Sequence, residues 1–309
     1  MRSSIMCFRG WLCLAFLLTA CGGKGGAPDE SSTANLWEEF SGTRALADVQ
    51  HLVDLGPRPP GTEALEKARG YITQQLEAAG WKVTRQTFTD TTPRGAMTFV
   101  NLIATHAPKG GKSLPSFLLC SHYDTKFFEN ETFVGANDGG SSNGILLELA
   151  RVLARRGELA AKVELVFFDG EEAYVNFTET DGLYGSRYFA KQLQTEGKAK
   201  QFHGGILFDM VGDRDLTITL SPDSPRQLTL DIFAAAQALT LRQHFTFAPN
   251  DILDDHAPIH AIGIPTIDLI DFDYPPWHTP ADTMDKLSAE SLGIVGQVAT
   301  RYLSEMAFQ

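Results

Sequence analysis

The sequence predicts an α/β fold: a single domain with a mostly parallel central sheet flanked by helices. Short apolar runs, each long enough for one buried strand, alternate with longer segments that have apolar residues at helical spacing. This alternation is typical of parallel sheets covered by helices on both faces. The 309 residues are 43 % apolar and 21 % charged, which is ordinary globular usage. No internal repeat or second domain boundary is visible.

Amphipathic periodicity predicts the helices, several of which are bounded by capping or terminating residues. Gly56 and Gly80 close the first two, and Ser141 or Ser142 can cap the third. The run GPRPPGT at 56–62 is expected to be a rigid connector between the first two helices. The expected helices cover residues 36–55, 63–79, 141–156, 185–193, 227–239 and 283–306.

Short runs of β-forming residues predict the strands, and the first two should form a hairpin. Residues 108–113 are expected to be a loop, and so are 271–279. The expected strands cover residues 81–88, 97–105, 116–120, 163–168, 205–211, 216–220 and 264–270.

The stretch VELVFFDGEE at 163–172 carries the strongest functional signal. Its apolar run contains one charge, Glu164, and is broken by Asp169 and Gly170 before two adjacent carboxylates, Glu171 and Glu172. In open α/β sheets, ligands bind at the carboxyl ends of the strands. Two neighbouring carboxylates there can divide the work, one on a metal and one as a proton carrier, if their environments separate their pKa values. A solvated acidic turn is the alternative.

Further polar residues follow other expected strands. Asp209, inside the apolar strand 205–211, is costly to bury unless it meets a cation or strong donors. Taken alone, each of these polar residues has an ordinary explanation, such as a core histidine, a helix cap or a loop residue. Together they predict a site of oxygen and imidazole ligands that suits Zn²⁺. The set comprises His122, Asp124, Asp138, Glu171, Glu172, Asp209, Asp254, Asp255, His256 and His278.

The net charge and the cysteine content limit the partners and metal ligands that the protein can have. A formal net charge of −12 argues against a nucleic-acid partner, which needs a basic face. An acidic pocket suits a cationic group such as a free α-amine. Beyond the first 21 residues the only cysteine is Cys120, in an apolar run, and we expect it to be buried. Any metal must therefore use His, Asp and Glu.

The first residues predict export. Arg2 and Arg9 precede a short apolar core, and the run LTAC ending at Cys21 resembles a bacterial lipobox. We expect a signal peptide at residues 1–20, a flexible tether at 21–33 and the folded domain at 34–309. The protein would then be lipid-anchored through Cys21 to a bacterial membrane, facing the periplasm, with the outer membrane as the expected location. An ordinary secretory signal with a chance cysteine is the alternative.

Six motifs in order resemble the animal-type glutaminyl cyclases, which are glutaminyl-peptide cyclotransferases of the zinc aminopeptidase-like superfamily. The resemblance extends over about residues 35–306 and implies a zinc aminopeptidase/phosphorylase-hydrolase-like fold. It also implies cyclisation of the N-terminal glutamine of peptides or proteins to pyroglutamate, with release of ammonia. We expect the protein to be a monomer. The motifs are GPRPPGT at 56–62, SHYDTK at 121–126, FFDGEEA at 167–173, LYGSR at 183–187, DDHAPI at 254–259 and WHTPAD at 277–282.

The same resemblance implies roles for single residues. Asp138, Glu172 and His278 match the ligands of one zinc ion, and Glu171 matches the general acid/base. The remaining positions are Asp254 in the proton-transfer network, Asp209 holding the substrate α-amine, and Trp277 and Phe177 as pocket walls.

Two departures from the family and two alternative functions remain. Asp268 stands where the animal enzymes have a histidine, and Phe177 where they have a tryptophan, which affects expectations of rate and specificity. His122 and Asp209 match second-metal positions of dinuclear zinc aminopeptidases, so hydrolysis of N-terminal residues is one alternative. A peptide-binding lipoprotein without metal or turnover is the other.

Overall fold

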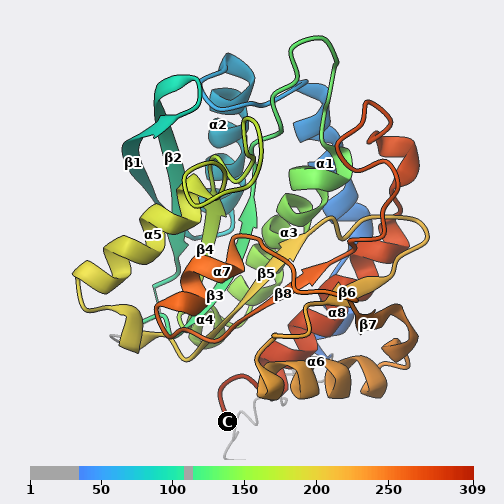
Figure 1. Cartoon of the computed structure of the whole chain (residues 1–309). Coiled ribbons are helices and arrows are strands. Elements are labelled where there is room, and N and C mark those ends of the chain that lie inside the picture. The colour runs from blue at the N-terminus through green and yellow to red at the C-terminus, as the bar shows by residue number, and fades with distance from the viewer. Residues whose placement is uncertain (1–34, 108–113) are drawn as a thin grey trace, which may run out of the picture. The chain divides into compact units, whose positions relative to one another are not determined.

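The computed structural model describes residues 35–107 and 114–309 (Figure 1). The expected signal peptide and tether, with Cys21, and the loop at 108–113 lie outside the described residues. Within the described part, every helix is too short or too polar to span a bilayer.

In the described part of the chain, eight strands form one mixed sheet in the order β1-β2-β4-β3-β5-β8-β6-β7. The four central strands β4, β3, β5 and β8 run parallel, whereas β1 and β2 form an antiparallel hairpin that joins β4. Beyond β8, β6 is antiparallel to it and β7 is parallel to β6. The strands are β1 (Lys82–Thr92), β2 (Gly95–Thr105), β3 (Phe117–His122), β4 (Val163–Phe168), β5 (Gly204–Asp209), β6 (Ile218–Leu220), β7 (Phe245–Phe247) and β8 (Thr266–Ile270). The predicted mostly parallel centre is confirmed, and β7 is an addition.

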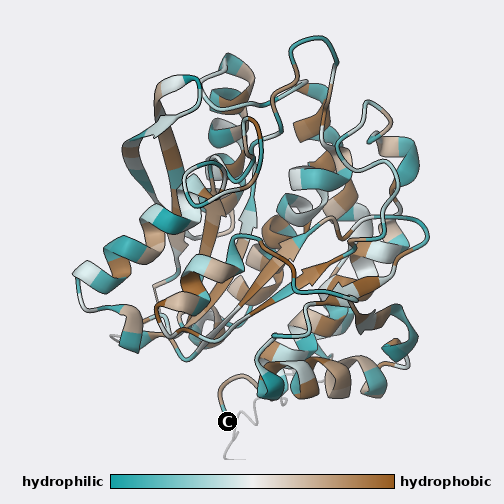
Figure 2. Ribbon diagram, in the orientation of Figure 1, coloured by the Kyte–Doolittle hydropathy of each residue, from teal (hydrophilic) through white to brown (hydrophobic). Residues whose placement is uncertain are grey.

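Alternate residues of the central strands enter different cores, which confirms that helices cover both faces. Phe117 and Leu119 of β3 belong to the large core that includes residues of α1, α2, α3 and α8. Leu118 and Cys120 point to the smaller core under α5 and α7. Figure 2 shows that these strands are mostly apolar, whereas the helices carry both apolar and polar residues. Cys120 is buried, as expected.

The predicted helices occur in the predicted order with corrected ends, and the short helices α4 and α7 are additions. The helices are α1 (Gly42–Asp54), α2 (Glu63–Ala78), α3 (Ser142–Ala154), α4 (Gly157–Ala160), α5 (Tyr184–Thr195), α6 (Arg226–Ala238), α7 (His256–Ala261) and α8 (Ala289–Glu305). The expected helices 36–55 and 283–306 are each split into a short 3₁₀ turn and an α-helix. The side chains of Ser41 and Ser288 cap α1 and α8 by accepting backbone N–H groups, so these helices start at their caps.

Arg58, in the expected rigid connector, is fully buried and anchors the loops around the site. Its guanidinium donates to the carbonyls of Tyr123 (3.3 Å), Val134 (2.8 Å) and Gly135 (3.1 Å), and also to Leu52 and Gly56. A buried guanidinium needs such acceptors for its N–H groups. Arg58 therefore joins the end of α1 to the segments that follow β3 and precede Asp138.

Candidate metal and active site

The carboxyl ends of three parallel strands bring the predicted polar residues together. His122 is the last residue of β3, Asp209 is the last of β5, and Glu171 and Glu172 follow β4. Asp209 was expected inside its strand, but the strand ends at Asp209 itself. Its carboxylate consequently lies at the rim of the sheet, where it can face a ligand.

Asp138 lies in a sharp turn, Ala136–Ser141, just before α3. The Asp282 carboxylate accepts the backbone N–H groups of Asn137 (2.8 Å) and Asp138 (3.1 Å), which fixes this turn. Gly139 has a φ of 74°, and a Cβ there would lie 2.7 Å from the Asp124 carbonyl and 2.9 Å from the His122 ring. Only glycine permits the close approach of this turn to β3.

The first trio of candidate metal ligands consists of Asp138, Glu172 and His278. Nε2 of His278 lies 3.1 Å from Oε2 of Glu172 and 3.4 Å from Oδ2 of Asp138. A tetrahedral ion with bonds of roughly 2.1 Å separates its ligand atoms by about 3.4 Å. The predicted ligand set therefore has distances that fit one ion.

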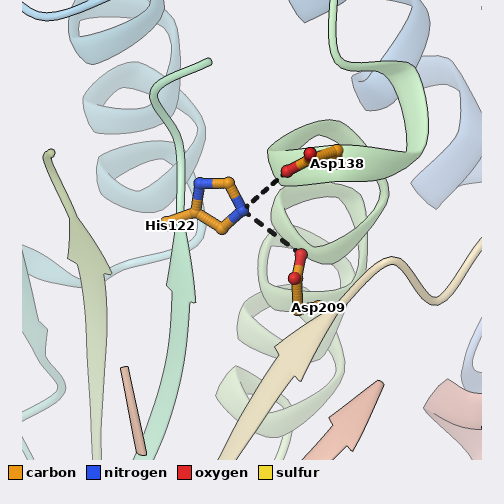
Figure 3. Close-up of side chains that lie close together, drawn as sticks. All are labelled: His122, Asp138 and Asp209. Carbon is orange, nitrogen blue, oxygen red and sulfur yellow. Dashed lines mark hydrogen bonds and ion pairs between the residues drawn. The ribbon is translucent and has the colours of Figure 1, made fainter. Parts of the chain in front are cut away.

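The second trio shares Asp138 and adds His122 and Asp209 (Figure 3). Nε2 of His122 lies 3.2 Å from Oδ1 of Asp209 and 3.3 Å from Oδ1 of Asp138. Asp209 also accepts the backbone N–H of Met210 at 2.8 Å. These distances likewise suit one ion, so the Asp138 carboxylate could bridge two cations or serve one.

Asp124 and Lys126 position the two glutamates. The Asp124 carboxylate accepts the backbone N–H groups of Glu171 (3.1 Å) and Glu172 (3.4 Å). Lys126 donates to the Ala173 carbonyl at 2.8 Å and lies 3.4 Å from Oε2 of Glu172. The turn that carries the two glutamates after β4 is thereby held in place.

Burial dominates the protonation of the site. It raises the pKa of Glu171 well above its ordinary value, the carboxylates of Glu172 and Asp254 raise that pKa further, and His122 opposes them. Burial also opposes ionisation of His278, but Asp138 and Glu172 outweigh it and raise the His278 pKa to about 9. A metal-ligating imidazole must be neutral, so binding an ion at the first trio would release this proton.

A cavity of about 210 Å³ opens beside the first trio. Its lining includes seven of the eight predicted site residues: Asp138, Glu171, Phe177, Asp209, Asp254, Trp277 and His278. The eighth, Glu172, belongs to the first trio. Asp268 is buried and does not line the cavity; its Oδ2 lies 3.6 Å from Nδ1 of His256.

The sequence did not predict several residues that line the cavity or hold the ligand-bearing turn in place. Leu253 and Phe272 line the cavity and were not predicted, although Leu253 directly precedes Asp254 and Phe272 lies in the expected loop that carries Trp277. Asp282 is the last residue of the WHTPAD motif, and its carboxylate holds the Asp138 turn by accepting the backbone N–H of Asp138. Adjacency to motifs was the available signal for these residues, because apolar loop residues and second-layer carboxylates have no spacing pattern of their own.

Comparisons with known proteins agree with this geometry. The family model described as Peptidase family M28 matches residues 101–303. A glutaminyl-peptide cyclotransferase-like protein of Mus musculus is 31 % identical over 277 residues, 80 % of this chain and 72 % of the relative. A crystal structure of an Acidobacteriales bacterium glutaminyl cyclase has a TM-score of 0.80 and 31 % identity, covering 90 % of this chain and 97 % of its own. A Zn-dependent exopeptidase from Parabacteroides distasonis has a TM-score of 0.79 and 26 % identity, covering 86 % and 99 %.

The mostly parallel sheet, with candidate metal ligands at the carboxyl ends of its strands, defines the class of the protein. It is an α/β protein built like the metal-dependent exopeptidases. Within that class the sequence relatives are more specific, because relatives that are 30–31 % identical cover most of both chains. The chain belongs to peptidase family M28 and to the glutaminyl-peptide cyclotransferases.

Proposed function

We propose that the protein cyclises the N-terminal glutamine of peptides or proteins to pyroglutamate, releases ammonia and uses one zinc ion per chain. The observation that carries this proposal is the small cavity beside the first trio, into which Glu171 and Asp209 both face. Such an enclosure suits one compact residue with a free α-amine. The similarity to glutaminyl cyclases supports the same reaction.

The first trio suits zinc by its chemistry as well as its distances. Two carboxylates and an imidazole are common zinc ligands, and three of them leave a position open for substrate. Oδ2 of Asp138 and Oε1 of Glu172 are buried and have no hydrogen-bond partner among residues 35–107 and 114–309, which favours a cation beside them. Zinc bound there would polarise the γ-carbonyl of the substrate glutamine.

The protein groups around that carbonyl would move one proton. The α-amine nitrogen of the substrate attacks the γ-carbon and forms the C–N bond of the ring, while the bond from the γ-carbon to the amide nitrogen breaks. Glu171 takes the proton from the attacking amine and returns it to the leaving ammonia. Asp209 holds the α-amine, and Asp254, buried in the same cavity, completes the proton-transfer network. Because the attack is intramolecular, orientation within the cavity supplies much of the rate.

A second candidate function is hydrolysis of N-terminal residues by a dinuclear zinc aminopeptidase. The second trio is the specific observation that favours it, together with the likeness to a Zn-dependent exopeptidase. In that reaction Asp209 would ligate a metal ion and would not be available for the amine. The two functions therefore differ in the metal count and in the use of Asp209.

Measuring metal and products together tests the proposal. The purified protein is stripped of metal, titrated with zinc, and incubated with Gln-peptides and with leucine anilide. We expect full activity at one zinc per chain, pyroglutamate formation and little leucine release. Two zinc ions with fast leucine release and no pyroglutamate would establish the aminopeptidase instead. Absence of both metal and turnover would favour a peptide-binding lipoprotein.

We also propose that the protein is exported as a monomer and anchored by a lipid on Cys21, with residues 22–33 as a tether. The LTAC run and the small polar residues that follow it support this proposal. The anchor would leave the catalytic domain free to reach peptide N-termini in the aqueous phase.

A further inference from the structure

The candidate catalytic cavity is lined by buried carboxylates at its base and by exposed apolar side chains at its opening. Four of the carboxylates that line it, Asp138, Glu171, Asp209 and Asp254, are at most 7 % exposed. By contrast, three of its apolar wall residues are strongly exposed: Leu253 (58 %), Phe272 (46 %) and Trp277 (39 %). Seven large apolar side chains are this exposed among the described residues, so three of seven belong to one opening. This concentration marks a binding surface.

The size of the cavity determines which part of a peptide substrate lies inside it and which part lies at its opening. Its volume of about 210 Å³ is below the range of roughly 300–1,000 Å³ usual for ligand pockets. One compact residue fills it. If the glutamine side chain points to the first trio and its α-amine to Asp209, the rest of the peptide has to leave through the opening. The second residue of the substrate then lies against the exposed apolar side chains.

Resting on the proposed function, we propose that Leu253, Phe272 and Trp277 form a rim subsite for an apolar side chain at the second position of the substrate. Phe272 and Trp277 already contact each other, with ring centroids 5.2 Å apart and planes inclined by 50°, so part of this surface is preformed. Leu253 comes from the segment before α7, whereas the two aromatic residues follow β8.

Charge at the opening excludes one class of second residue. Asp251 is exposed and also lines the cavity, so it places a carboxylate at the opening. An acidic second residue would be repelled by this negative charge and would gain no apolar contact. The rim subsite therefore favours leucine or phenylalanine over glycine, and disfavours glutamate.

Leu253 and Phe272 are neither candidate metal ligands nor acid/base residues, so substitutions there should act mainly on KM. Partial burial of one leucine or phenylalanine side chain predicts a preference over glycine of about five- to tenfold in kcat/KM.

The test compares peptides that differ only in the second residue: Gln-Leu, Gln-Phe, Gln-Gly and Gln-Glu. Wild-type protein should prefer them in the order apolar, glycine, glutamate. Leu253→Gln and Phe272→Gln should reduce the Leu-over-Gly ratio towards one through KM. Leu230→Gln is the matched control, because Leu230 is 49 % exposed on α6 and lies outside the cavity lining. It should keep the wild-type ratio.

The outcomes separate this inference from the proposed function. Equal kcat/KM for all four Gln-peptides, or a ratio that Leu253→Gln leaves unchanged, would overturn the rim subsite while pyroglutamate formation upholds the cyclase. Absence of pyroglutamate from every peptide would overturn the cyclase and the subsite with it. A wild-type dimer that Leu253→Gln converts to a monomer would reassign the rim to a contact between two copies of this chain.

Discussion

The indole of Trp277 stacks on the imidazole of His278, with ring centroids 4.3 Å apart and planes 27° apart. The backbone of His278 has a φ of 53°, which is uncommon for a residue other than glycine. The stack holds the ring in place with Nε2 towards Glu172 and covers one of its faces. Trp277 thereby joins the candidate metal ligand to the wall of the cavity.

Trp277→Ala should reduce cyclisation about 100-fold, because a poorly confined glutamine rarely meets the geometry of attack. The zinc content should stay near that of the wild type, since none of the three ligands changes. Initial rates and metal analysis on the same preparation measure both effects. Trp277→Phe is the control and should retain most activity. Wild-type rates in Trp277→Ala would refute the role of the indole.

The adjacent glutamates should respond differently to the same substitution. Glu172→Gln should lose zinc, because it removes one of three protein ligands. Glu171→Gln should keep zinc but lose activity by a factor of about 100 to 10,000, since an amide cannot transfer the proton. Zinc titration by calorimetry and turnover with a Gln-peptide measure the two effects. The opposite pattern would reverse the two roles.

Asp181 positions the loop that carries Phe177. Its buried carboxylate accepts the backbone N–H groups of Tyr174 (2.9 Å), Val175 (2.8 Å) and Asn176 (3.3 Å). Asp181→Ala should release this loop and raise KM about tenfold with a smaller change in kcat, because Phe177 no longer confines the substrate. Asp181→Asn retains one acceptor oxygen and should recover part of the loss. A fall in kcat at constant KM would contradict this positioning role.

Glu164 should make the folded state less stable as the pH rises. The residue is partly buried on β4, and burial raises its pKa from 4.5 to about 7, although Lys198 opposes the shift. The folded state then binds more protons than the unfolded state between pH 4.5 and 7. The free energy of unfolding therefore decreases through that interval.

Glu164→Gln should remove this component of the pH dependence. Near pH 4 the variant and the wild type should have similar stability, whereas above pH 7 the variant should be more stable. Urea unfolding across this pH range measures the difference. A constant offset between the two proteins at every pH would show that Glu164 does not titrate with a raised pKa.

Cys21→Ala should abolish membrane fractionation when the full chain is expressed in a bacterium with lipoprotein processing. Removing the lipidated cysteine leaves at most a cleaved secretory protein. Cys120→Ala is the matched control and should fractionate like the wild type. Wild-type protein that is wholly soluble after leader cleavage would end the lipoprotein proposal.

Much of the fold followed from local patterns. The apolar run ending at Phe168 is a strand, and the Gly80 position closes the second helix, as periodicity and turn residues predicted. The ends of α1 and α8 were wrong because serine caps interrupt segments that remain amphipathic throughout. The short strand β7 was missed because three residues give no periodicity. The short helices α4 and α7 were missed for a similar reason.

The sequence by itself determined which side chains could take part in the chemistry: carboxylates and imidazoles at strand ends, without cysteine. Only the tertiary structure decided how they group. Asp138 lies between two histidines, His122 and His278, that are 156 residues apart in the sequence (278 − 122), and so belongs to both trios. The exposure of Leu253 beside Phe272 was likewise decided by packing. The physical reason is that ligand geometry and apolar exposure depend on distances between segments, and the parallel order of β4, β3, β5 and β8 sets these distances.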